Sequence, residues 1–127
     1  MTRTDLLTNL QKITETIATE VNPDAPDHVV EKLQALSSLT GLAAECTKEA
    51  KRMHLDAQRL IIRTLGENKN MPASILSKYI DSNCSQEIAD ITYCERINSA
   101  IAHSCDALRS IISWKKEEMN RSSYQQG

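Results

Sequence analysis

Two long stretches of this chain carry apolar side chains at the three- and four-residue spacing of an α-helix. One covers about residues 27–65, where Gly66 is a suitable C-cap, and the other covers about 83–120. A shorter stretch, 5–21, has the same spacing. Sheet proteins draw on aromatic and turn residues, whereas this chain has three Gly, three Pro and no Phe. The sequence therefore predicts an all-α fold.

The arrangement expected from these stretches is an antiparallel hairpin of two long helices with an additional N-terminal helix. Each long stretch has an apolar face to bury, and they are separated by a connection at residues 67–72. We expect the N-terminal helix in residues 1–22, the hairpin domain in 23–120 and a polar, disordered tail in 121–127. Whether the first helix packs on its own chain or is exchanged with a neighbour is left open.

Several local features refine this expectation. Thr4 is placed to cap the first helix, and Asn83 and Gln86 stand in capping-box positions before the last one. The segment 37–41 contains a glycine and is the expected point of a bend, and 73–80 has the spacing of two further helical turns. The expected core stripe of the hairpin comprises Leu39, Leu42, Ala43, Cys46, Ala50, Met53, Ala57, Leu60 and Ile61 facing Cys94, Ile97, Ile101, Cys105, Leu108, Ile112 and Met119.

Charge and targeting signals narrow the class of protein. The chain has 15 Lys+Arg against 17 Asp+Glu, a formal charge of −2, which argues against a dedicated polybasic nucleic-acid binder. No secretory signal is visible, and no apolar run reaches the roughly 18 residues of a membrane span. Four cysteines are too few for a disulfide-dense secreted scaffold. We therefore expect a cytoplasmic protein with reduced thiols and no membrane partner.

The residues that could carry chemistry form no recognisable catalytic or metal-binding motif. No closely spaced Cys or His pair suggests a metal site, and no cofactor is expected. Cys84 near a helix start has no assignable His partner, so we predict that the chain is not an enzyme. Folding the hairpin about its connection places Cys46 level with Cys105. This pair reads best as small apolar side chains in a seam, with a thiol or metal switch as the weaker alternative.

A row of cations marks the side of the second helix away from its expected core. Lys48, Arg52, Arg59 and Arg63 fall within about 60° of arc at 100° per residue. Such a row can contact an acidic partner, an anionic ligand or a phosphate backbone. Asp56 interrupts it, so an ordinary solvated charged face is the competing interpretation.

Three apolar side chains lie off the core stripes. Trp114 stands beside lysines and is a candidate for contact with a partner or ligand, unless it packs on the first helix. Leu55 and Ile62, seven residues apart, give the second helix a second apolar side. A helix that is apolar on two sides normally has two partners, so we predict self-association through Leu55 and Ile62.

The segments Leu39–Glu45 and Leu108–Glu118 resemble the two arms of small helical-hairpin accessory proteins of phage and prophage genomes. The resemblance covers about residues 33–119 and is one of helical pattern, with no catalytic residues to carry over. It implies a phage-derived accessory protein acting in a host cytoplasm.

The function that these features favour is a non-enzymatic helical interaction module that self-associates. It would occupy a host or phage protein, as a phage-encoded inhibitor of a host-defence protein does, or sequester an anionic ligand. The alternative is an accessory factor in phage DNA recombination or replication that binds nucleic acid through the basic face. The net charge of −2 counts against this alternative.

Overall fold

The structure is a computed structural model that describes residues 1–65 and 71–126, with side chains described as far as Ser122. It contains α1 (Arg3–Ala18), α2 (Pro26–Leu65), α3 (Ala73–Asn83) and α4 (Ser85–Gln126), and no strand occurs within these ranges. The all-α prediction is therefore confirmed. The glycine expected to cap the second helix, Gly66, lies outside the described residues.

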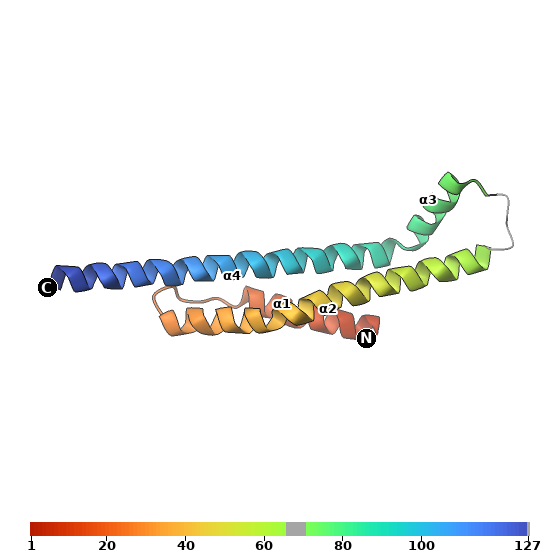
Figure 1. The fold of residues 1–127 in the computed structure, drawn as a ribbon. Helices are drawn as coiled ribbons and strands as arrows, with labels where there is room; N and C mark the ends of the chain where they lie inside the picture. The colour runs from red at the N-terminus through yellow and green to blue at the C-terminus, as the bar shows by residue number, and fades with distance from the viewer. Residues whose placement is uncertain (66–70, 127) are drawn as a thin grey trace.

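The two long helices lie along each other and run in opposite directions (Figure 1). α1 packs against both of them within the same chain, and α3 stands at the end of the bundle where α2 finishes. The C-terminal part of α4 projects beyond the turn that joins α1 to α2. The molecule is thus an elongated three-helix bundle with a short fourth helix at one end.

The buried core joins one stripe from each of the three long helices. α1 contributes Leu6, Leu10 and Ile13, all at most 1% exposed, as its apolar spacing predicted. Half of the buried residues that α2 and α4 contribute are Ala or Cys, whose small side chains let two helix backbones approach closely. The buried residues of α2 and α4 in this cluster are Val29, Leu36, Ala43, Cys46, Ala50, Cys94, Ile97, Ile101, Cys105 and Leu108.

Polar side chains from different parts of the chain form hydrogen bonds with the free backbone groups at the two ends of α1. Its N-cap is Thr2, which forms a capping box with Asp5, so the prediction of Thr4 as the cap is wrong. The hydrogen bonds from Thr2 hold the pKa of the Asp5 carboxyl below its usual value. At the other end, Lys32 Nζ of α2 donates to the carbonyl oxygens of Ile17 (2.8 Å) and Thr19 (2.7 Å). This contact ties the C-terminus of α1 to α2.

α3 changes the register that the sequence suggested for the two long helices. Asn83 ends α3, and its amide donates to the Tyr79 carbonyl at 2.8 Å, so the capping box predicted for Asn83 and Gln86 does not form. α4 begins at Ser85, close to the predicted start, but it begins short of the end of α2, and α3 packs against both helices there. Cys46 therefore meets α4 about three turns earlier than predicted. Cys46 accordingly lies near Cys94, and Cys105 lines a groove with Ser37 and Thr40.

The same shift leaves parts of the expected core stripe in solvent. Leu60 is 63% exposed and Met119 is 67% exposed, because α2 extends beyond the start of α4 and α4 extends beyond the start of α2. α2 runs unbroken through residues 37–41, and Figure 1 shows it changing direction near its middle. α4 continues to Gln126, six residues past the predicted boundary at Asn120, where we expected a disordered tail.

Candidate interaction surface

One side of α2 is covered by neither α1 nor α4, although some of its residues border α4, and we call it the outward face. From residue 37 to residue 55 its positions repeat at alternating steps of four and three residues, and the last position follows seven residues later, which keeps them in one line along the helix. The line begins with small residues and ends with two large apolar ones. It comprises Ser37, Gly41, Ala44, Lys48, Lys51, Leu55 and Ile62, and Arg59 stands beside it.

The outward face is open along its whole length. Leu55 is 50% exposed and Ile62 is 52% exposed. A Cβ atom added to Gly41 would meet no atom within 4 Å. Between these points, Ala44, Lys51 and Leu55 help to line a shallow, mainly apolar hollow. The two apolar side chains predicted as an interface are therefore accessible, and the face that carries them has no covering element in the described chain.

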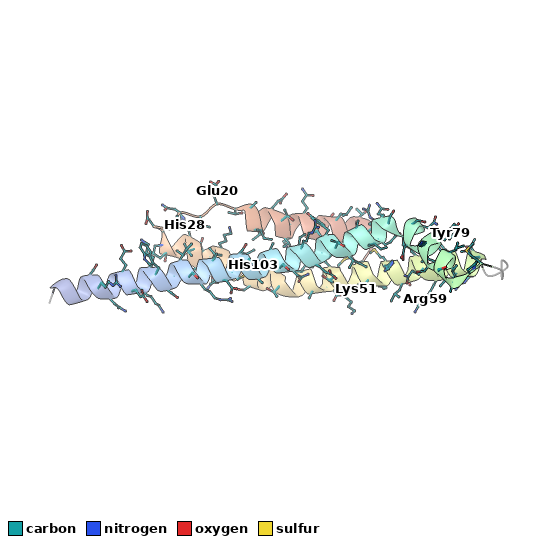
Figure 2. All side chains as sticks on the ribbon, turned by 90° about the horizontal axis from the view of Figure 1, so that it is seen from above. Glu20, His28, Lys51, Arg59, Tyr79 and His103 are labelled. Atoms are coloured by element: carbon teal, nitrogen blue, oxygen red, sulfur yellow. The ribbon has the colours of Figure 1, made fainter. Side chains whose placement is uncertain are left out.

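The cations of the outward face are only loosely neutralised. Lys48 Nζ is 4.0 Å from Glu45, and an Arg59 guanidinium nitrogen is 3.9 Å from Asp56. Both distances are at the outer limit of an ion pair, and exposed pairs of this kind contribute little to stability. Lys51 also belongs to this face, and Figure 2 shows Lys51 and Arg59 on the side of the molecule away from α1.

Arg52 was also predicted to belong to this row of cations, but its side chain binds groups of its own chain. Its guanidinium donates to Glu49 at 2.7 Å, to Asp56 at 2.9 Å and to the Met1 carbonyl at 3.0 Å. The hydrogen bond and charge of Arg52 lower the pKa of the Glu49 carboxyl. Arg52 therefore fastens the start of α1 to α2. Arg63 is exposed in the last turn of α2, next to residues 66–70, which the structure does not describe.

Trp114 lies far from the outward face, on the projecting part of α4. Its side chain is 58% exposed, and the Lys115 ammonium is 5.2 Å from the centre of its ring. Lys115 also binds Asp24 of the α1–α2 connection at 3.1 Å and Glu118 at 3.4 Å. Trp114 and the cations of α2 are thus separate surface features that the fold does not bring together.

The four cysteines are free thiols and all are buried. Burial, with a smaller contribution from the nearby Cys46, raises the pKa of Cys94 to about 11. Burial likewise raises the pKa values of Cys46 and Cys84. Since the Cys46–Cys105 alignment is not formed, a thiol switch between those two residues loses its geometric basis. Within the described residues, no group of three or more His, Cys, Asp or Glu could hold a metal ion.

We expect the Cys94 thiol to resist alkylation in the folded protein at pH 8, because burial keeps it protonated and covered. Its raised pKa also predicts a pH dependence of stability. The contribution of Cys94 to the free energy of unfolding should be constant below about pH 9 and should fall as the pH rises from 9 toward 11, because the thiol of the unfolded chain ionises first. Urea titrations across this range check the expectation, with Cys94→Ala as the control that reduces the fall, while the buried Cys46 and Cys84 thiols account for part of what is left. Rapid alkylation of Cys94 in the folded protein, assigned by peptide mass, would contradict the predicted protection of this thiol.

Comparison with protein-family models, with curated proteins and with solved structures finds no match to this chain. Among the described residues, no helix combines the length and the apolar character needed to cross a membrane.

Proposed function

We propose that this protein is a non-enzymatic helical interaction module that binds a partner through the outward face of α2. One observation carries the proposal: Leu55 and Ile62 are half exposed in one line on a helix face that also carries loosely paired cations and that no other described helix covers. Exposed apolar side chains are common singly, but two in line with loosely paired cations are typical of a recognition helix.

Leu55 and Ile62 contribute to binding in a different way from the charges around them. Fully burying an exposed Leu or Ile side chain contributes about 1.5–3 kcal/mol. Because Leu55 and Ile62 are each about half exposed, covering both contributes about 1.5–3 kcal/mol together, a minor part of the roughly 8 kcal/mol of a micromolar affinity. Surface cations add less to affinity, and they act mainly on the rate of encounter and on the choice of partner. The outward face therefore combines apolar side chains that contribute affinity with positive charges that influence the choice of partner.

The more specific versions of this function remain proposals. In one, the module is a phage-encoded inhibitor that occupies a host-defence protein in the host cytoplasm, or a protein that sequesters an anionic ligand. In another, two copies associate through Leu55 and Ile62.

Binding of nucleic acid in phage recombination or replication is the second candidate function, supported by the exposed Lys48, Arg59 and Arg63 of α2. Leu55 counts against it, because an apolar side chain gains little from contact with a phosphate backbone.

Site-specific photo-crosslinking tests the general proposal. A photoreactive amino acid replaces Leu55 in one variant and Leu60 in another, and each is irradiated in an extract of the source cells. Leu60 is the matched control, because it lies on the same helix and is more exposed (63%) but points to a different side. We expect discrete crosslinked species from position 55 and at least tenfold less from position 60. Equal labelling at the two positions, or none at position 55, would contradict an interaction through this face.

A further inference from the structure

We propose that the outward face of α2 takes an acidic amphipathic helix of another protein. This inference rests on the proposed function, since it names the class of partner for the same face. Three features of the face support it: its charge, its spacing and the arrangement of its small and large residues.

The charge of the outward face has one sign. Lys48, Lys51 and Arg59 lie on it, whereas the nearest carboxylates of α2, Glu45 and Asp56, stand toward its edge on the α1 side. Glu95 of α4 lines a hollow with Lys51 on the opposite edge. The centre of the face is therefore cationic, and a partner with carboxylates flanking its apolar stripe complements it.

The spacing of the face suits a helix. Its first six positions repeat every three and four residues and Ile62 follows one heptad after Leu55, which is the pattern into which the side chains of a second helix interdigitate. Ser37, Gly41 and Ala44 allow a close approach of the two backbones at one end. Leu55 and Ile62 offer anchors at the other end, one heptad apart. A partner that matches this face needs large apolar residues toward the start of α2 and acidic residues beside Lys51.

A second copy of the chain fits this face poorly. In a parallel pairing of two α2 helices, Arg59 meets Arg59 of the other copy. In an antiparallel pairing centred on Leu55, Arg59 meets Lys51 of the other copy, and other registers that join Leu55 to Ile62 bring the two Arg59 side chains within about one turn. Like charges held together at an interface are unfavourable by several kcal/mol. A partner of opposite charge avoids this cost.

A designed peptide provides the test. The probe is a fluorescein-labelled helical 21-residue peptide with Leu at the seam positions and Glu at the flanking positions, and the matched probe has Lys in place of every Glu. Fluorescence anisotropy with the full chain should show the Glu peptide binding at least tenfold more tightly than the Lys peptide. The variant K48E/K51E/R59E should reverse this preference, and L55A/I62A should weaken the Glu peptide at least tenfold. Leu60→Ala and Lys116→Glu are the controls, which should leave both affinities unchanged, and circular dichroism checks that each variant is folded.

Three results would overturn the inference. The first is equal or absent binding of the two peptides. The second is displacement of the Glu peptide by a duplex DNA that binds L55A/I62A as tightly as it binds the original chain. This result identifies a phosphate backbone as the occupant. The third is a dimer in sedimentation equilibrium that L55A/I62A abolishes, which identifies a second copy. If any of these occurs while position 55 still gives its specific crosslink, the interaction module stands and only the assigned partner is wrong.

Discussion

Replacing Leu10 by Ala should lower the free energy of unfolding by about 2–5 kcal/mol, the usual range for removing a fully buried Leu side chain. Leu10 is 1% exposed and lies in the centre of the α1 stripe. Its loss leaves a cavity where α1 meets the two long helices. Urea unfolding followed by circular dichroism at 222 nm measures the change.

Leu7→Ala is the matched control for this prediction. Leu7 is on the same helix and involves the same chemical change, but its side chain is 39% exposed. We expect its effect to be below about 1 kcal/mol, as for substitutions away from a packed core. Equal losses for the two variants would mean that α1 does not pack on the bundle as described.

Asn98→Asp should be the most disruptive single polar substitution in the seam between α2 and α4. The Asn98 amide nitrogen lies 2.7 Å from Thr47 Oγ1, 2.9 Å from the Cys94 carbonyl oxygen and 3.3 Å from the Ala43 carbonyl oxygen. A carboxylate has no proton to donate there and would face two carbonyl oxygens. We expect a loss of about 1–3 kcal/mol at pH 7, the cost of buried polar groups left without partners.

The pH dependence gives this prediction a distinctive sign. The surrounding carbonyl oxygens should raise the folded-state pKa of the introduced carboxyl above its unfolded value of about 3.9. The variant should therefore be closest to the original protein below pH 4 and should lose stability as the pH rises through the folded-state pKa. Asn120→Asp, at an exposed position of α4, is the control and should show no such trend. A loss from Asn98→Asp that is the same at pH 4 and pH 7 would contradict the assigned hydrogen bonds.

The sequence was sufficient to predict the helices but not their register. The spacing of Leu6, Leu10 and Ile13 predicted a buried stripe that the structure contains, because local periodicity decides which face of a helix is apolar. Register depends instead on how the connection and α3 place α4 along α2. The spacing of residues 73–80 indicates two helical turns but not that α3 packs between the end of α2 and the start of α4. This placement moves Cys46 from the level of Cys105 to that of Cys94 and exposes Leu60.

The candidate surface was predicted in part for a similar reason. Helical phase alone correctly indicated that Leu55 and Ile62 lie away from the core. It could not show that Arg52 is occupied by Glu49 and the Met1 carbonyl, since the latter contact comes from a distant part of the chain. Lys51 was missed, although the four- and three-residue steps that join it to Lys48 and Leu55 are visible in the sequence. Asn98 was also missed, because only the fold brings Thr47 beside it.

The overhanging ends of α2 and α4 affect how the size of this protein should be measured. α4 alone has 42 residues and is therefore about 63 Å long. A compact chain of 127 residues would have a radius of gyration of only about 14 Å, so this protein extends well beyond the dimensions of a compact particle. An elongated particle has higher hydrodynamic friction than a sphere of equal mass, so a monomer will elute early in gel filtration and resemble a dimer. The self-association predicted through Leu55 and Ile62 should accordingly be judged by methods that report mass independently of shape.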